Sequence, residues 1–253
     1  MRVITVANQK GGCAKTTTVV NLAASLVSFG KRVLVIDLDA QANSSTWLGA
    51  GREANGSFGL LTGKQDLADL IVPSRSPGVD IIAASREMAS VEKLLAGELA
   101  SEGILMRRMK TLPKDKWDFV LIDTPPTIGL VTINAMVAAN DLLIPVTTHV
   151  MTLSGVAQLV RAYEDVKALL NPALNILGFL PSRVDLRTRH AQEILDAMTE
   201  RFGSKVFQTR IHENVRLAEA PSFGQSILDY KPKSSAAADY LSLAREVLQL
   251  TRQ

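Results

Sequence analysis

An apolar run that opens into a glycine-rich turn and then a helical segment constrains this chain more than any other feature. Residues 3–7 read VITVA, and residues 10–17 read KGGCAKTT. In a strand–loop–helix unit of this kind, backbone N–H groups of the loop face an anion, and the helix N-terminus adds favourable partial charge. The sequence therefore predicts a nucleoside triphosphate site at the end of a buried first strand.

The loop differs from the standard P-loop pattern G-x-x-x-x-G-K-[ST], which would place glycine at positions 9 and 14. Gln9 and Ala14 stand there, and a second lysine, Lys10, precedes the two glycines. We expect Lys15 to reach the β- and γ-phosphates and the Thr16 hydroxyl to ligate Mg²⁺. A second lysine helps most where negative charge builds up in phosphoryl transfer. We expect Ala14 to have φ below zero, which a helix start permits.

Acidic residues end two further apolar runs. Asp37 and Asp39 close the run 32–39, and Asp123 closes the run 117–123. Period-2 geometry points Asp37 and Asp39 the same way if the strand continues that far. Each acid alone could be a helix cap or a loop residue, but ligands bind at the carboxyl ends of strands in open α/β sheets. We therefore expect Asp37 and Asp123, with Thr16, to hold Mg²⁺, and Asp39 to orient the attacking water.

Strand-like and helical patterns alternate along the chain. Strands are predicted near 2–7, 32–37, 79–84, 118–123, 141–147, 175–181 and 205–210, and helices at 15–29, 87–97, 101–112, 128–139, 153–170, 188–202 and 235–251. This alternation predicts an α/β fold with a mostly parallel, twisted sheet covered by helices on both faces. Residues 49–78 are the least regular and are interpreted as a loop with short helices. We predict one domain over residues 1–253.

Composition excludes several classes of protein. The chain has 253 residues, 47% hydrophobic and 21% charged, which is typical of a globular protein. No run approaches the roughly 18 apolar residues of a membrane span, and no signal peptide precedes the first strand, so we expect a cytoplasmic protein. Cys13 is the one cysteine and is expected to be a small filler in the loop, with a reactive thiol as the alternative. A net charge of +3 permits a basic patch without requiring one.

Longer motifs resemble those of one family. The loop fits the deviant pattern K-G-G-x-x-K-T, residues 37–43 (DLDAQAN) resemble D-x-D-P-Q-G-N, and residues 129–135 (GLVTINA) and 214–222 (NVRLAEAPS) resemble further ParA segments. The ParA family consists of deviant-Walker ATPases in the superfamily of MinD and the nitrogenase iron protein. The resemblance covers nearly the whole chain. Departures are Ala14 for glycine, Ala40 for proline, and Glu213 where many relatives carry a basic residue.

The resemblance implies ATP and Mg²⁺ as cofactors and a weak ATP hydrolase that a partner protein stimulates. Relatives form a sandwich homodimer around two ATP molecules, in which the residue matching Lys10 reaches the partner's nucleotide. The implied catalytic residues are Lys10, Lys15 and Asp39. The implied ATP-binding residues are Lys10, Gly11, Gly12, Cys13, Ala14, Lys15, Thr16, Thr17 and Pro221.

The resemblance also implies that the ATP-bound dimer binds DNA without sequence preference and segregates a chromosome or plasmid with a ParB-like partner. Arg187 and Arg216 match positions of DNA-binding arginines in the family, and Lys231 and Lys233 are weaker candidates. Each could instead be a solvated charge or half of a salt bridge. The protein is then expected on the nucleoid. The chain starts at its first strand, so it is expected to lack the N-terminal DNA-binding extension of larger plasmid ParA proteins.

Two alternatives stay open. Other ParA relatives position protein assemblies, and a cargo-adaptor protein would then replace the ParB-like partner. A MinD-like membrane ATPase would need an amphipathic C-terminal helix beyond the domain. The apolar stripe within residues 237–248 is more typical of core packing, so no membrane partner is expected. A cluster-bridged dimer like the iron protein would need two cysteines per subunit and is set aside.

Overall fold

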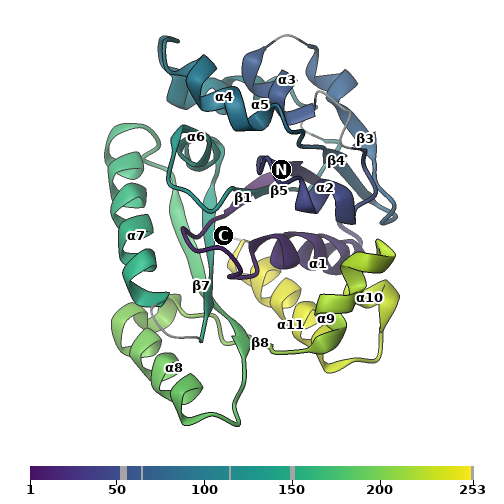
Figure 1. Ribbon diagram of the computed structural model, residues 1–253, viewed down its shortest axis with the longest axis vertical. Coiled ribbons are helices and arrows are strands. Elements are labelled where there is room, and N and C mark those ends of the chain that lie inside the picture. Colours follow the sequence, from purple (N-terminus) through teal and green to yellow (C-terminus); the bar gives the residue numbers. More distant parts are fainter. Residues whose placement is uncertain (52–55, 64, 114, 149–151, 252–253) are drawn as a thin grey trace.

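A single eight-stranded sheet forms the centre of the computed structural model, which describes residues 1–51, 56–63, 65–113, 115–148 and 152–251 (Figure 1). The strand order is β3-β4-β2-β5-β1-β6-β7-β8, and neighbouring strands are parallel except β3 and β4. Strands β2 to β5 lie on one side of β1 and strands β6 to β8 lie on the other, so the strand order reverses at β1. Open α/β sheets bind ligands at such a switch point, and the segment after β1 lies there. The predicted α/β fold class is confirmed.

The elements have the following bounds. The strands are β1 Arg2–Val6, β2 Val33–Asp37, β3 Ile71–Pro73, β4 Val79–Ile82, β5 Phe119–Asp123, β6 Asp141–Thr147, β7 Asn175–Val184 and β8 Ile211–His212. The α-helices are α1 Lys15–Ser28, α2 Asn43–Trp47, α3 Gly56–Thr62, α4 Met88–Leu95, α5 Ile104–Met109, α6 Leu130–Ala138, α7 Thr152–Leu169, α8 Arg189–Phe202, α9 Val215–Glu219, α10 Ile227–Tyr230 and α11 Ser235–Leu250. Short 3₁₀ helices are η1 Leu67–Leu70, η2 Ser101–Gly103, η3 Gly203–Lys205 and η4 Ala220–Phe223.

Side chains that alternate along the strands build two cores, one on each face of the sheet. In β2, Leu34 and Ile36 join one core, whereas Val33 and Val35 join the other. The first core is covered by helices α3 to α8, and the second by α1, α10 and α11 (Figure 1). Every residue of β2 is buried, as expected for a parallel strand with helices on both sides. No helix in the described part of the chain is both long and apolar enough to cross a membrane.

One predicted strand is wrong. A strand was expected over 205–210, but η3 ends at Lys205 and Val206 makes one isolated bridge to Phe179 before β8 begins at Ile211. The Glu246 carboxylate accepts hydrogen bonds from the backbone N–H groups of residues 208 and 209, at 2.8 and 2.9 Å. A side chain on α11 therefore satisfies N–H groups that would otherwise extend a strand ladder.

Other boundaries also differ from the prediction. The helix expected over 101–112 is a 3₁₀ turn, η2, followed by the six-residue α5. The irregular segment 49–78 contains the expected short helices, α3 and η1, but it also contributes β3, which pairs antiparallel with β4. Three residues are too few to show a period-2 pattern, so this edge strand leaves no clear trace in the sequence.

Gly178 marks a close approach between β7 and the segment that follows η3. A Cβ built on Gly178 would lie 2.6 Å from Cε2 of Phe207 and 2.9 Å from the carbonyl oxygen of Lys205. The β6–β7 register also shifts between Leu142 and Leu143, and Leu143 is the residue that pairs with Gly178. Only glycine fits there without moving the Phe207 ring or the backbone.

We expect Gly178→Ala to lower the free energy of unfolding by about 1–3 kcal/mol, because the added methyl group overpacks the site. The melting temperature should fall by about 3–10 °C in thermal denaturation. Gly155→Ala is the matched control: it is the same change within helix α7, where a Cβ meets none of the described residues within 4 Å. It should leave the protein unchanged or raise its stability by up to about 1 kcal/mol. Equal melting temperatures for the two variants would contradict the close approach.

Candidate functional site

A cleft of about 500 Å³ lies where the carboxyl ends of the central strands meet the N-terminus of α1. One wall is the loop after β1, and the opposite wall comes from β7, β8 and α9. The lining residues are Gly11, Gly12, Cys13, Ala14, Lys15, Thr16, Thr17, Asp39, Gln41, Asn43, Pro126, Arg183, Ile211, His212, Glu213, Asn214, Leu217, Ala218 and Tyr240. The structure thus brings residues 11–17 of the predicted phosphate loop and Asp39 into one cavity, whereas Lys10 is not among the lining residues.

The phosphate loop presents backbone donors to the cleft. Helix α1 begins at Lys15, and no described side chain caps its first N–H groups. A Cβ built on Gly11 or Gly12 would also meet no described residue within 4 Å. Uncapped N–H groups at a helix start form an anion site. Lys15 is buried, and its Nζ lies 3.5 Å from the Lys10 carbonyl oxygen. The loop can therefore take a phosphate without rearranging a capping side chain.

Cys13 is buried within this loop, and its Sγ donates to the Lys10 carbonyl oxygen at 3.0 Å. Burial raises the pKa of the Cys13 thiol, and the nearby Lys15 charge opposes this only in part. A neutral, buried thiol is a poor nucleophile. The environment favours the filler role over the reactive-thiol alternative.

The expectation for Ala14 is wrong. Ala14 has φ 69° and ψ 27°, in the left-handed region, immediately before the first residue of α1. The position keeps the left-handed conformation that glycine adopts at no steric cost, and alanine adopts it at a cost of roughly 1 kcal/mol. The loop geometry is therefore imposed by the strand and helix on either side, against the local preference of alanine.

Asp37 and Asp123 lie side by side beneath the cleft. They are register partners at the ends of β2 and β5, and both are buried. Asp37 accepts hydrogen bonds from the Ser45 N–H and hydroxyl at 2.8 and 2.7 Å. Asp123 Oδ2 accepts from the hydroxyls of Thr16 and Ser44, at 2.8 and 2.7 Å. The two serines come from α2, which the sequence did not reveal as a helix.

Burial raises the pKa of both carboxyls. Desolvation, followed by the charge of Asp123, raises the pKa of Asp37 to about 7. Desolvation raises the pKa of Asp123 to about 6, opposed by its hydrogen bonds from Ser44 and Thr16 and by the Lys15 charge. Burial and mutual repulsion oppose the ionisation of both acids, so a cation that neutralises them would be favoured at this position.

The geometry beneath the loop fits Mg²⁺. Asp123 Oδ1 is buried and has no hydrogen-bond partner among the described residues, while Oδ2 is bonded to the Thr16 hydroxyl. Mg²⁺ in nucleotide sites takes one or two carboxylates, and phosphates and waters complete its octahedron. Both oxygens of Asp37 accept hydrogen bonds. Thr16 and Asp123 are therefore the better-placed pair, and Asp37 lies behind them.

Strand β2 ends at Asp37, and Asp39 lies beyond it. The expectation that both side chains point the same way required the strand to continue to Asp39, and this condition is not met. Asp39 lines the cleft and is partly exposed. Its Oδ1 accepts a hydrogen bond from the Gln41 N–H at 3.0 Å. This turn holds a carboxylate at the cleft surface, where it can contact water.

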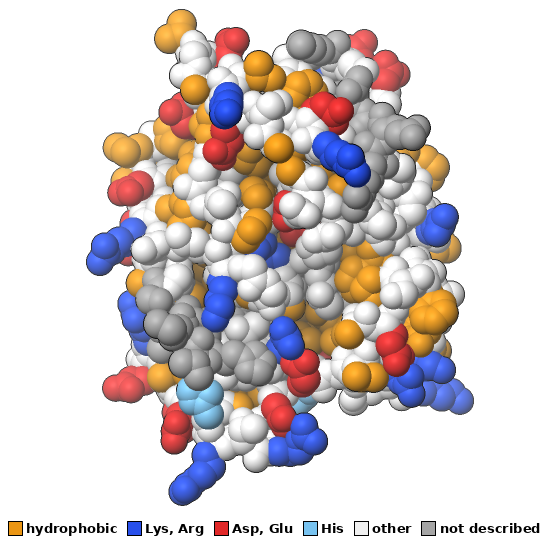
Figure 2. All heavy atoms as spheres, viewed as in Figure 1, with side chains coloured by type: hydrophobic (Ala, Val, Ile, Leu, Met, Phe, Trp, Pro, Cys, Tyr) orange, Lys and Arg blue, Asp and Glu red, His pale blue; other side chains and the backbone are white. Residues whose placement is uncertain are grey.

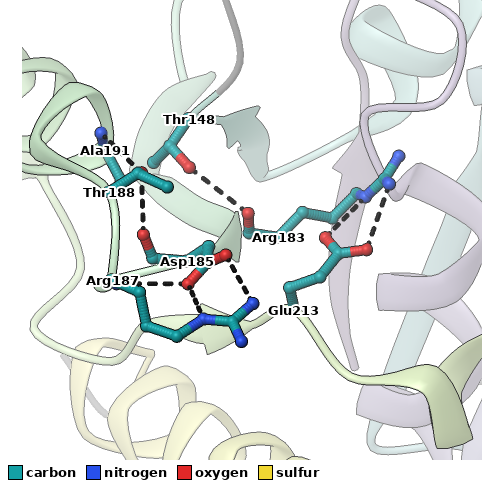
Figure 3. A network of polar contacts seen from close by, with 7 residues as sticks. All are labelled: Thr148, Arg183, Asp185, Arg187, Thr188, Ala191 and Glu213. Carbon is teal, nitrogen blue, oxygen red and sulfur yellow. Dashed lines mark hydrogen bonds and ion pairs between the residues drawn. The ribbon is translucent and has the colours of Figure 1, made fainter.

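An ion pair lining the cleft was not predicted. Arg183 and Glu213 form two hydrogen bonds, at 2.9 and 3.1 Å, and the Arg183 carbonyl oxygen accepts from the Thr148 hydroxyl (Figure 3). Arg183 has φ 53° where the β7–β8 register shifts. Glu213 is the acidic residue at a position where many relatives carry a basic one. The charge of Arg183, on strand β7, neutralises it. Only the unusual charge at 213 could have indicated this pair.

The DNA-binding candidates lie outside the cleft. Arg187 pairs with Asp185 at 2.8 Å beside the Arg183–Glu213 pair (Figure 3), and Arg216 pairs with Glu219 at 2.8 Å. Exposed pairs of this kind contribute little to stability, so a phosphate can replace the carboxylate at small cost. Lys231 Nζ lies 5.5 Å from the centroid of the Tyr230 ring, and Lys233 is exposed. Pro221 is exposed on η4 and does not line the cleft, so its contact with ATP stays a prediction.

Comparisons with known proteins agree with this geometry. A family model described as an AAA domain matches residues 1–176. The chromosome-partitioning ATPase Soj of Thermus thermophilus is 42% identical, over 98% of this chain and 96% of its own. The chromosome partitioning protein ParA of Caulobacter vibrioides is 38% identical, over 100% of this chain and 96% of its own. The chain therefore belongs to the ParA/Soj family of P-loop ATPases.

A solved structure shows the same fold with nucleotide. The Mycobacterium smegmatis protein described as cobyrinic acid a,c-diamide synthase, with bound ADP and magnesium, has a TM-score of 0.87 and 32% sequence identity. The match covers 98% of this chain and 94% of that chain. A relative with the same arrangement of strands and helices thus holds a nucleotide and Mg²⁺.

We expect Ala14→Gly to raise the free energy of unfolding by up to about 1 kcal/mol, because glycine relieves the left-handed strain despite its larger unfolded-state entropy. Chemical denaturation measures this difference. Ala138→Gly is the control, since position 138 ends a regular helix, α6, and the same change there should destabilise the protein. Destabilisation of similar size in both variants would contradict the strained loop.

We expect Asp123→Asn to raise the stability of the metal-free protein at pH 8 by about 2 kcal/mol, because it removes one of two charges buried together. The asparagine oxygen can still accept from Thr16 and Ser44. In the wild type, the two raised pKa values make protonated carboxyls favour folding. That contribution is present below about pH 4 and is lost as pH rises through 6 and 7.

Thermal denaturation in EDTA between pH 5 and 8 tests this expectation. The melting temperature of the wild type should fall more steeply with rising pH than that of Asp123→Asn. Asp196→Asn is the control, because this exposed acid on helix α8 does not line the cleft. A lower melting temperature for Asp123→Asn than for the wild type at pH 8 would show that the two charges do not oppose folding.

Proposed function

We propose that this member of the ParA/Soj family is a Mg²⁺-dependent ATP hydrolase that binds DNA non-specifically as an ATP-bound dimer and segregates a chromosome or plasmid. The observation that carries the ATPase part is the Thr16–Asp123 hydrogen bond beneath an uncapped phosphate loop. It joins the first helical turn to the end of the neighbouring strand where a nucleotide-bound cation would lie. The family membership supports the partition part. We also propose that residues 1–253 act as one domain.

In this proposal the phosphates lie on the backbone donors of residues 11–17, and Lys15 contacts the β- and γ-phosphates. Thr16 and Asp123 hold Mg²⁺, and Asp37 contributes through the hydrogen-bonded layer behind them. Bound Mg²⁺ neutralises charge on the β- and γ-phosphate oxygens. Asp39 orients the attacking water from the cleft surface. Lys10 is exposed and near the cleft, as a residue that serves a partner subunit's nucleotide requires.

DNA binding is proposed through Arg187, Arg216, Lys231 and Lys233, all outside the cleft. A monomer with a net charge of +3 offers few phosphate contacts, so its affinity is low and salt-sensitive. Pairing two monomers doubles the contacts on one duplex, and affinity rises steeply with the number of phosphates neutralised. ATP thereby controls DNA affinity through dimerisation. The protein would then lie on the nucleoid, in the cytoplasm.

A ParB-like protein that stimulates hydrolysis is the proposed partner, and a cargo-adaptor protein that positions a protein assembly is the alternative. The MinD-like membrane reading is less favoured by the structure. Tyr240, Leu243 and Val247 on α11 are buried in the core that α11 shares with α1. The apolar stripe that could have met a membrane is thus already covered within the fold.

We expect Asp39→Ala to bind ATP but to hydrolyse it at least about tenfold more slowly, because the variant lacks the carboxylate that orients water. The ATP-bound dimer should then accumulate in size-exclusion chromatography with ATP and Mg²⁺. Asp185→Ala is the control, since this acid pairs with Arg187 outside the cleft. Unimpaired turnover, or a monomer at every concentration, would contradict the role of Asp39.

The test of the proposed function is DNA binding with ATP or ADP. Fluorescence anisotropy with labelled duplexes of unrelated sequence should show binding with ATP that weakens as salt rises and does not depend on sequence. Arg187→Ala and Arg216→Ala should each weaken it at least about threefold while ATP binding and dimerisation persist. Equal binding with ADP, or binding to one sequence only, would refute the switch. Liposome binding without DNA binding would favour the MinD-like alternative.

A further inference from the structure

Arg75 lies in the loop between β3 and β4, away from the motifs and from the cleft lining. It is exposed, and its side chain crosses two glycines with positive φ, Gly49 (74°) and Gly224 (62°). A Cβ at Gly49 would lie 2.4 Å from Cγ and Cδ of Arg75, and a Cβ at Gly224 would lie 3.2 Å from its Nη1. Two glycines distant in sequence therefore form a groove for this one side chain.

Further contacts hold the groove together. The Arg75 N–H donates to the Leu48 carbonyl oxygen at 2.8 Å, which fixes the start of the side chain beside Gly49. Trp47 is buried, and its indole N–H donates to the Gln225 carbonyl oxygen at 2.7 Å, next to Gly224. An arginine side chain carries about 2 kcal/mol of rotamer entropy. A groove that already restricts it lowers the entropy that a bound ligand must remove.

The groove brings Arg75 to a basic and aromatic surface. Phe223 is 61% exposed and stacks on Tyr230 with ring centroids 4.9 Å apart. The Tyr230 hydroxyl donates to Glu219, which also pairs with Arg216, and Lys231 lies over the Tyr230 ring. We call this the Gly224 surface; its members are Arg75, Arg216, Phe223, Tyr230 and Lys231. Figure 2 shows Lys or Arg side chains beside hydrophobic ones in the region of α10 and the loop after it, at the lower right.

Arg75 and Arg216 differ in whether a described carboxylate pairs with them. Among the described residues, no carboxylate lies within ion-pair distance of Arg75, whereas Arg216 is paired with Glu219. A guanidinium presents a planar fork of donors that matches phosphate oxygens. Duplex DNA carries one negative charge per about 1.7 Å of its axis, so cations on separate segments of one surface can each meet a phosphate. An exposed aromatic ring on the same surface can lie against the sugars.

We propose that Arg75 is a DNA-phosphate contact, and that the Gly224 surface forms a DNA-binding face wider than the motif residues indicate. The proposal rests on the proposed DNA-binding function. Arg75 contributes a preformed cation with which no described carboxylate pairs, and the Gly49–Gly224 groove is what directs it to that face. The exposed Phe223 ring, stacked on Tyr230, supplies a flat contact to the DNA backbone on the same surface.

The test compares Arg75→Met with Arg32→Met. Methionine keeps an unbranched apolar stem for the glycine groove and removes the charge. Arg32, exposed just before β2, is already paired with Asp118, so the control removes the same charge from an arginine that a carboxylate compensates. Anisotropy with a labelled random duplex, ATP and Mg²⁺ gives the dissociation constant at several salt concentrations, and circular dichroism and ATP titration check folding and nucleotide binding.

We expect Arg75→Met to weaken DNA binding about 3–10-fold at 0.1 M salt and to lower the slope of log affinity against log salt by about 0.9 for each Arg75 that meets a phosphate. Arg32→Met should bind as the wild type does, and Arg75→Lys should keep the wild-type slope. Equal losses in the two methionine variants, or a loss without a change in slope, would overturn the phosphate contact.

The wild-type measurement separates the proposed DNA-binding function from the proposed Arg75 contact. Failure of the wild type to bind DNA with ATP would overturn the proposed function and Arg75's part in it together. Wild-type DNA binding that Arg75→Met leaves intact would overturn only the Arg75 contact. Should Arg75→Met instead abolish capture of an acidic partner protein and spare DNA binding, the Gly224 surface would be a protein-binding face, which also contradicts this inference.

Discussion

The burial of Asp37 and Asp123 side by side is the constraint around which the centre of the molecule is arranged. Two carboxylates without water need donors, and here the donors come from α1 and α2. Because Thr16 belongs to the first turn of α1, satisfying Asp123 also fixes the start of the helix that presents the phosphate loop. One oxygen, Asp123 Oδ1, is left without a described partner, so the same arrangement leaves room for a cation. Stability and the capacity to bind a metal nucleotide thus depend on one set of contacts.

The five-residue helix α2 extends that arrangement across the molecule. Ser44 and Ser45, in its first turn, bond the two buried acids, and Trp47 at its end bonds the Gln225 carbonyl oxygen. Gly49 then supports Arg75. A continuous series of direct contacts therefore runs from the buried carboxylates to the Gly224 surface. Helix α2 is too short to be stable alone, so these tertiary bonds at both ends, rather than helix propensity, must hold it.

The sequence was sufficient to predict the regular alternation of strands and helices and the residues that belong to a motif. Six of the eight strands of the sheet, all except β3 and β8, lie at or near predicted apolar runs, and the loop, Asp39 and the two buried acids lie close together as expected. The missed elements depend on partners distant in the chain. Residues 208 and 209 are kept from a strand by Glu246, and the Arg183–Glu213 pair joins residues 30 positions apart. No local pattern contains that information, because the competing hydrogen-bond acceptor lies on another element.

Backbone strain is concentrated at the cleft. The elements around the cleft must therefore hold the strained residues in place when no ligand is bound. Four non-glycine residues among those described have positive φ, and two of them, Ala14 and Arg183, line the cleft. A third, Ala42, lies between the lining residues Gln41 and Asn43. Each such residue costs roughly 1–3 kcal/mol and persists only where the surroundings determine its conformation. The surroundings here are strand ends and helix starts with buried hydrogen bonds. The favourable contacts of the sheet and helices thus offset the backbone strain and hold the loop donors towards the cleft. Because the loop is already ordered, less conformational entropy is lost when a phosphate binds.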